Sequence, residues 1–194
     1  MKQKIHFLLL SSLFLLIACQ QQAPTIDHEL LTMVGQALPN HHITFASPRG
    51  IGNSDIWIVG VDGTGERNLT DGQNGTDLYP EWGPKGDYIY YTSNKHGGTL
   101  ELYRVNTAGT PQPQQLTQLN REVRSLAISA DDQRIALGVM TADVPLGADL
   151  KPYSADLFFL HRDVLDKTIA ENRLISMDDL ELVLSEPQTE HVWY

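Results

Sequence analysis

The feature that most constrains the fold of this chain is a repeat of 46 residues. Three short, apolar, β-prone segments begin at Ile43, Ile89 and Ile135, so their starts are 46 residues apart both times. A second pair of segments, Asp55–Val59 and Glu101–Val105, has the same spacing. A period of this length built from short strands is typical of β-propeller blades, which are four-stranded sheets placed around an axis. The sequence therefore predicts an all-β fold, a partial β-propeller of about three four-stranded blades.

Turn residues separate the predicted strands at matching places in the repeat. The segments Asp62–Gly65 and Asn106–Gly109 both follow a predicted third strand, and their glycines supply the positive φ angles of tight turns. The first of them superficially resembles the catalytic triplet of aspartic proteases, but its place in the repeat favours a turn. Trp82 and Ile128 occupy the same slot in successive repeats.

The second repeat carries the residues of a known repeat family. It reads Pro-Glu-Trp-Gly-Pro-Lys-Gly over 80–86, followed by a strand ending in Thr92-Ser93, an apolar-aromatic strand with Leu102-Tyr103, and a closing Leu116-Thr117. This pattern resembles the WD40-like repeat of TolB and its relatives. The resemblance covers residues 43–140 and implies a TolB-like propeller fold.

The sequence departs from that family in three ways. The usual Ser-Pro-Asp-Gly turn is Gly-Pro-Lys-Gly over 83–86, and it becomes Ser-Ala-Asp-Asp over 129–132. There is no sign of a separate N-terminal domain. The TolB family is soluble in the periplasm and carries no lipidated cysteine, so the resemblance is to the repeat and does not extend to TolB itself.

The first twenty residues have the pattern of a bacterial lipoprotein signal. Lys2 and Lys4 precede an almost wholly apolar run over 5–17, which is short for a membrane span and suits the core of a signal peptide. The run ends in Leu-Ile-Ala-Cys19, and Cys19 is the only cysteine. This resembles the lipobox, which implies cleavage before Cys19 and acyl chains that anchor the mature protein. An ordinary signal peptide with a chance cysteine is the alternative.

Three parts of the chain follow from these patterns. We expect a signal peptide over 1–18, a lipidated Cys19 with a polar tether over 19–40, and propeller repeats over 41–194. The mature protein is then expected in the cell envelope, lipid-anchored and facing the periplasm. Gln20 after the cysteine, where an aspartate would retain a lipoprotein at the inner membrane, favours the outer membrane.

The composition excludes some functions. Lys and Arg number 14 against 24 Asp and Glu, a formal net charge of −10, which argues against nucleic acid as a partner. The seven histidines form no His-x-His or His-Glu-x-x-His pattern, so we expect no bound metal and no cofactor. No Gly-x-Ser-x-Gly motif occurs, and the acidic pairs fit solvated turns, so we name no catalytic residue and expect a protein that is not an enzyme.

Aromatic and aliphatic residues define the expected core and one candidate surface. The aromatic residues between 57 and 103 are expected to pack between blades, with alternate rings on opposite faces of each sheet. A binding platform, if the protein has one, is expected at the loop ends near Tyr79 and Asp87. The residues expected in the repeat core are Ile43, Trp57, Trp82, Ile89, Tyr103 and Ile135.

The C-terminal third is less regular. The segment 154–160 is predicted as a strand that arrives late in the third repeat, after a proline-containing loop over 141–153. Ser176–Asp179 could cap a short helix, and Leu180–Leu184 fits a strand equally well.

The expected function is that of a non-catalytic interaction scaffold in the periplasm. Envelope proteins are the expected partners, and the membrane is contacted through the anchor at Cys19. About three blades form an open arc with two apolar faces, so self-association that completes a propeller is one expectation. The alternatives are the N-terminal part of a propeller lyase or peptidase whose catalytic portion lies beyond residue 194, or a remnant of a longer gene.

Overall fold

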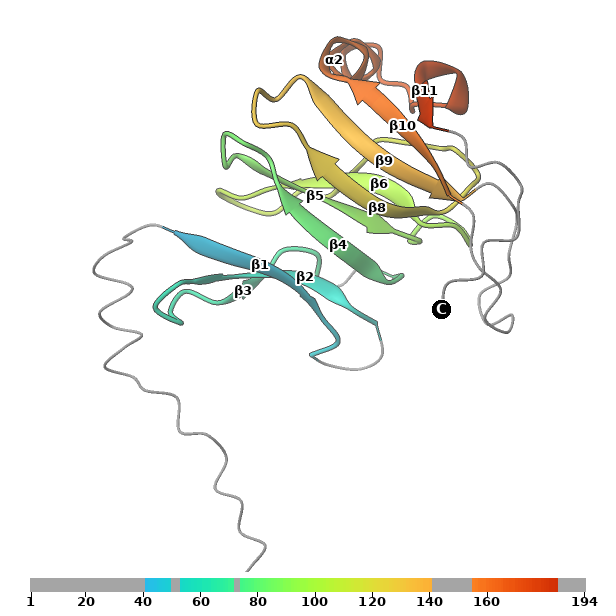
Figure 1. Cartoon of the computed structure of the whole chain (residues 1–194). Coiled ribbons are helices and arrows are strands. Elements are labelled where there is room, and N and C mark those ends of the chain that lie inside the picture. The colour runs from blue at the N-terminus through green and yellow to red at the C-terminus, as the bar shows by residue number, and fades with distance from the viewer. Residues whose placement is uncertain (1–40, 50–52, 72–73, 141–154, 185–194) are drawn as a thin grey trace, which may run out of the picture.

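The computed structural model describes residues 41–49, 53–71, 74–140 and 155–184 of the 194-residue chain. Within these ranges three antiparallel sheets lie one beside another, the second between the first and the third (Figure 1). The predicted signal peptide, Cys19 and tether lie outside the described residues. Among the described residues, no helix has the length and apolar character needed to cross a membrane.

The three sheets follow one another along the chain. The first sheet contains β1 (His42–Ser47), β2 (Asp55–Gly60) and β3 (Arg67–Asn68), in that order. The second contains β4 (Asp77–Trp82), β5 (Tyr88–Ser93), β6 (Glu101–Asn106) and β7 (Gln114–Gln115), again in chain order. The third contains β8 (Val123–Ile128), β9 (Arg134–Met140), β10 (Ala155–His161) and β11 (Glu181–Leu184).

This architecture confirms the predicted fold. The protein is mostly β, with antiparallel sheets of three or four strands. Trp82 pairs with Ile89 and Ile128 pairs with Ile135, so the predicted equivalence of Trp82 and Ile128 holds in the strand register. The first sheet differs from the expected four strands: within the described residues it has three, with no counterpart of β4 or β8.

Alternation along the strands builds one apolar core on each side of the second sheet. Tyr91 packs with Ile56 and Ile58 of β2 in a cluster that we call the first interface, between the first and second sheets. Tyr90, its neighbour in sequence, packs with Leu137 in a cluster that we call the second interface, between the second and third sheets. The two tyrosines point to opposite faces because successive side chains of a strand alternate.

The expectation that Ile43 is buried is wrong. Its repeat equivalents Ile89 and Ile135 are buried in the first and second interfaces, where each faces the preceding sheet. Ile43 is 52% exposed. It lies on the corresponding face of the first sheet, and none of the described sheets lies beyond that face. Burial at this position therefore depends on a neighbouring sheet and not on the strand itself.

The third sheet contains an insertion that sequence analysis missed. Between β10 and β11 lies the helix α2 (Arg162–Ala170), which buries Leu165 in the second interface. Asp163 in its first turn and Lys167 in its last suit the helix dipole, and Leu165 and Ile169 share one face. These features are the signal that could have revealed the helix.

The two alternatives left open for 176–184 both occur, one after the other. The side chain of Ser176 and that of Asp179 form a capping box around a short 3₁₀ helix, η1 (Met177–Asp179), and β11 follows at once. Before η1, the chain runs beside the second sheet. Ile175 donates a backbone hydrogen bond to Leu116 (2.9 Å) and accepts one from Gln118 (2.8 Å), which ties the insertion to β7's end of that sheet.

Candidate functional site

A pocket opens between the second and third sheets. It has a volume of about 530 Å³ and is formed by the β4–β5 turn, the β8–β9 turn and the start of α2. Because these segments belong to two sheets and an inserted helix, the pocket exists only when the second interface is assembled. Its charged lining residues are Lys85, Asp87, Arg104, Asp132, Arg162, Asp163 and Asp166.

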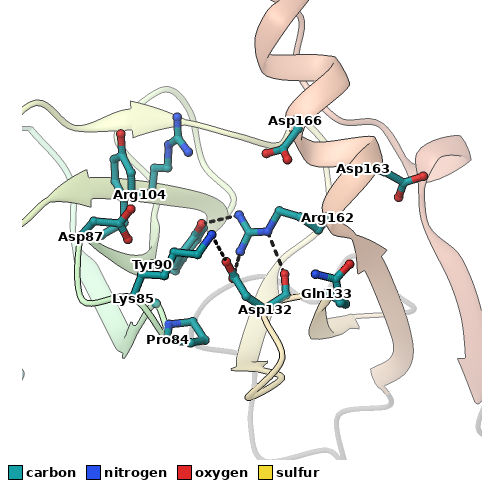
Figure 2. A pocket seen from close by; sticks show the side chains of 12 residues that line it. Pro84, Lys85, Asp87, Tyr90, Arg104, Asp132, Gln133, Arg162, Asp163 and Asp166 are labelled. Atoms are coloured by element: carbon teal, nitrogen blue, oxygen red, sulfur yellow. Dashed lines mark hydrogen bonds and ion pairs between the residues drawn. The ribbon is translucent and has the colours of Figure 1, made fainter.

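Arg162 is the central side chain of this pocket. Its Nη1 donates a hydrogen bond to the Tyr90 hydroxyl at 2.9 Å, and its Nε donates one to the Asp132 backbone carbonyl at 3.0 Å. Its Nη2 forms an ion pair with the Asp132 carboxylate (Figure 2). Burial opposes the charge on Arg162, but the contacts with Tyr90 and Asp132 outweigh it, and the pKa of the guanidinium is raised above its usual value.

Asp132 adopts a backbone conformation that usually belongs to glycine. Its φ is +59°, and its repeat equivalent Gly86 has a φ of +73°. A non-glycine residue in this left-handed region carries strain, although Asp and Asn tolerate it better than most. The Asp132 carboxylate also lies 3.3 Å from Lys85 Nζ on the second sheet. Asp132 thus stands where the preceding repeat has a glycine, and its carboxylate forms ion pairs with Lys85 and Arg162.

The third cation of the pocket is also engaged. The Arg104 guanidinium lies over the Tyr88 ring, 4.3 Å from its centroid, and its Nε donates a hydrogen bond to Gln114 Oε1 at 2.9 Å. In the described part of the chain, the carboxylates of Asp163 and Asp166 have neither a hydrogen bond nor an ion pair. The pocket therefore has its two arginines held in place and carboxylates accessible on the helix side (Figure 2).

A second pocket shows that this site is part of the repeat. It measures about 370 Å³, lies between the first and second sheets, and is lined by His42, Trp82, Gly86 and Thr107 among others. Thr107 holds the place of Arg162: its backbone N–H donates to the carbonyl of Asp87 at 3.0 Å, as that of Arg162 donates to Gln133 at 2.9 Å. Arg162 therefore places a long cation at a position that is a threonine in the preceding repeat, and this adds a charge to the larger pocket.

At the opposite end of the second sheet, a buried polar network holds the loops. Glu101 is 6% exposed, and its carboxylate accepts hydrogen bonds from Thr117 Oγ1 (2.6 Å) and the backbone N–H groups of Leu119 (3.0 Å) and Asn120 (2.9 Å). Thr117 Oγ1 in turn accepts the Leu102 N–H at 2.9 Å. The threonine of the closing Leu-Thr thus accepts a strand N–H in both the first and the second sheet, because Thr70 accepts the Ile56 N–H in the same way.

The structure separates the two residues expected to mark a binding platform. Asp87 lines the pocket, whereas Tyr79 does not. Tyr79 lies at the irregularity of β4, between the pairs formed by Leu78 and Glu81, with a φ of +52° and 42% of its surface exposed. Bulky residues at positive φ are strained, so Tyr79 is a separate exposed feature of the β4 edge.

Four of the six expected core residues fall in or beside the interfaces, and the expectation is wrong for Trp57 as it is for Ile43, because no described sheet covers the face on which both lie. Ile89, Tyr103 and Ile135 are buried, and Trp82 packs against the first interface while half-buried. Trp57 is half-buried on the outer face of the first sheet. Cys19, the expected lipidation site, lies outside the described residues.

Sequence reasoning did not find the residues that define the pocket. Arg162 and Tyr90 are 72 positions apart, and no local pattern links them. One signal was available at Asp132 and Lys85, because both stand where the family's turn has another residue. Departure from a repeat pattern at equivalent turns can thus point to a site.

No metal centre emerges from the described ranges. They contain no group of three or more His, Cys, Asp or Glu side chains able to hold a metal ion. His161 Nε2 pairs with Glu181 at 2.6 Å, and His96 Nδ1 lies 2.6 Å from the Tyr103 hydroxyl. Each of these histidines is engaged locally.

Comparison of the sequence with known families gives one match. Residues 26–146 match the family described as the dipeptidyl peptidase IV N-terminal region. The match takes in the first two sheets and the first half of the third. The chain belongs to this family. The matched region begins before β1 and includes part of the segment expected to be a tether. No curated protein matches the sequence.

Solved structures support the same fold. The putative TolB from Agrobacterium tumefaciens superposes with a TM-score of 0.54 at 21% identity, covering 63% of this chain and 42% of that one. TolB from Acinetobacter baumannii gives 0.40 at 22%, covering 60% and 26%. An oligogalacturonate lyase in complex with manganese gives 0.44 at 18%, covering 62% and 29%. The chain spans less than half the length of each, and the first likeness shows a TolB-like fold.

Proposed function

We propose that this protein is a lipid-anchored protein of the cell envelope that binds a protein partner and catalyses no reaction. Membership of a propeller-domain family and the TolB-like fold support a binding role, since such domains offer loop ends and exposed faces to partners. The lipoprotein pattern ending in Cys19 supports anchorage in the envelope, with the outer membrane favoured.

One observation carries the proposal: the pocket between the second and third sheets presents fixed charges at the loop ends. Arg104 and Arg162 are held by neighbouring groups, Lys85 lies beside them within reach of Asp132, and the acidic side chains of α2 remain accessible. Charges fixed in this way recognise a complementary surface with little loss of side-chain freedom on binding. We therefore expect the protein partner to dock at the end of the sheets where this pocket opens.

A photo-cross-linking amino acid at Gln133 tests the docking end in intact cells. Gln133 is exposed and lines the pocket, whereas Gln118 is exposed at the opposite end of the second sheet and provides the matched control. We expect one discrete adduct at Gln133, with a single envelope protein identified by mass spectrometry, and none of that species at Gln118. An equal adduct at both positions, or none at Gln133, contradicts the proposal.

Anchorage has its own test. Cells fed labelled palmitate should label the parent protein, and Cys19→Ser should lose the label and leave the membrane fraction. A labelled Cys19→Ser protein, or an unlabelled parent, contradicts a lipid anchor at this residue.

A second candidate function comes from the family itself. The matching family is described as the N-terminal region of a peptidase, so this chain could serve as the non-catalytic propeller portion of a larger peptidase. An antibody raised against the repeats distinguishes a binding protein from a portion of a peptidase by the size of the protein detected in cells. A product of the length of this chain supports the binding protein, and a far longer one supports the peptidase.

A further inference from the structure

Each sheet of this protein has two different faces. In the second sheet, one face meets the first sheet and the other meets the third. The side chains that face the preceding sheet are all buried: Ile89, Tyr91, Tyr103 and Val105. The third sheet repeats this face at the same register positions, again buried against the preceding sheet: Ile135, Leu137, Phe158 and Leu160.

The first sheet has the same face with no described sheet against it. Its pairs Ile43–Val59 and Phe45–Trp57 correspond to Ile89–Val105 and Tyr91–Tyr103 in the second sheet. Half of Ile43 is exposed, and the other three are half-buried. The guanidinium of Arg49 lies over Phe45 and Trp57, 5.1 and 5.5 Å from the two ring centroids. We call these four apolar residues the leading face.

The third sheet carries the complementary face at the other end of the arc. In the first sheet, Ile56 and Ile58 face the following sheet and are buried in the first interface. The residues at their positions in the third sheet are Leu157 and Phe159, which pair with Gly138 and Ala136 of β9 and are half-buried. We call these four residues the trailing face. Small residues on β9 leave its surface open beside the two large side chains.

We propose that the leading face packs against the trailing face of a second copy of this chain. The chain already builds this contact twice, as the first and second interfaces, so the two end faces are the unmatched halves of one repeated interface. The residues that define both faces are apolar, with one arginine over each, Arg49 over Phe45 and Arg134 over Phe159, and an uncovered apolar sheet face is costly in water. Two copies joined in this way bring together six of the described sheets, within the range of about four to eight blades of closed propellers.

The contact is head-to-tail, and this sets its geometry. A leading face meets a trailing face and not a second leading face, because only the former pair reproduces the interfaces inside the chain. Each copy contributes one described face of each kind, so the same contact formed twice between two copies would cover both end faces of each copy. The proposal does not depend on the pocket or on the identity of a protein partner.

Paired cysteines test this geometry in the full chain, in its native membranes. Ile43 and Leu157 correspond to Ile89 and Ile56, which share the first interface, and they lie on sheets at opposite ends of the arc (Figure 1). With a short bifunctional thiol reagent, the double variant Ile43→Cys/Leu157→Cys should form cross-linked dimers. Each single variant, and the parent with Cys19 alone, should not. Cross-linking of Ile43→Cys alone indicates a face-to-face contact and overturns the head-to-tail arrangement.

A charge on the leading face provides the second test, and it does not require a cysteine. Ile43→Glu should convert the dimer to a monomer in cross-linking with an amine-reactive reagent, because a carboxylate would be buried without a partner. Leu182→Glu is the control, because Leu182 on β11 is an apolar residue of similar exposure. This variant should remain a dimer, which would show that an added negative charge does not by itself separate the two copies. An Ile43→Glu protein that stays dimeric overturns the proposal, as does a parent that is monomeric or joined only to another protein.

Discussion

Arg162 donates a hydrogen bond to the hydroxyl of Tyr90 at 2.9 Å, although 72 residues separate them along the chain. Arg162 begins the helix inserted into the third sheet, and Tyr90 belongs to the second sheet. The contact therefore joins two repeats directly, at the edge of the second interface. It also fixes the cation around which the candidate site is built.

Loss of the Tyr90 hydroxyl should weaken the protein modestly. Tyr90→Phe removes one hydrogen bond to a charged donor, which costs about 1.5–3 kcal/mol of unfolding free energy. Tyr88→Phe is the matched control, because within the described residues the Tyr88 hydroxyl makes no hydrogen bond and its ring keeps its contact with Arg104. Urea unfolding of the two variants measures the difference, and equal stabilities would show that the contact does not contribute.

Substitutions at Asp132 should separate strain from charge. Asp132→Ala loses the pairing with Arg162 and keeps a strained positive φ, whereas Asp132→Gly loses the same pairing without strain. We expect the glycine variant to be more stable than the alanine variant by about 1 kcal/mol. Both should be less stable than the parent. Thermal melts of the three proteins check this order, and an alanine variant as stable as the glycine variant would argue against strain at this position.

Asp77 should make stability fall as the pH rises. Burial raises the pKa of its carboxyl above the usual 3.8, against hydrogen bonds from Ser93 and Thr70 that lower it. The folded state therefore holds this proton more tightly than the unfolded state does. Its contribution is greatest below pH 3.8 and is lost as the pH rises through the folded pKa.

The comparison that isolates this effect is between the parent and Asp77→Asn. Unfolding free energies measured between about pH 3 and 7 should show the parent losing stability relative to the variant as the pH rises. Any hydrogen bond lost in the variant shifts its curve by a constant and leaves the slope unaffected. Parallel curves, or a relative gain of the parent with rising pH, would exclude a raised pKa for Asp77.

Replacing the Glu101 carboxylate by the amide of glutamine should destabilise the protein. Its two carboxylate oxygens accept hydrogen bonds from four described donors, so the amide group of Glu101→Gln would place an N–H against an N–H or O–H donor. The expected cost is about 1–3 kcal/mol. Glu81→Gln, at an exposed position of β4, should cost little and provides the control. Chemical denaturation of both proteins tests the prediction, which fails if the two substitutions cost the same.

The repeat could be predicted from sequence because it is a local pattern. Strand alternation and a constant spacing of 46 residues place Trp82 and Ile128 in the same slot, and the strand register bears this out. The same repeat spacing predicts that Ile43 is buried, and this prediction is wrong. Equivalence within a repeat does not show whether a neighbouring sheet covers the residue. Position in the pattern specifies which face a residue lies on, and packing decides whether it is buried.

The candidate site could not be predicted in the same way. Arg162 occupies the place of Thr107 after an insertion that breaks the period, and its partners come from two other turns. Asp87 was found because it lies at a loop end in the regular part of the repeat. Tyr79 is expected at a loop end in the same way, but it lies at the irregularity of β4 and does not line the pocket.

The molar mass of the full-length lipidated protein, extracted in mild detergent, tests the central claim most directly. That claim is that the interface repeated inside the chain also joins one copy to another. Light scattering, with the detergent contribution subtracted, should give twice the mass of one chain, and Ile43→Glu should give the mass of one. A parent protein with the mass of a single chain would contradict the account.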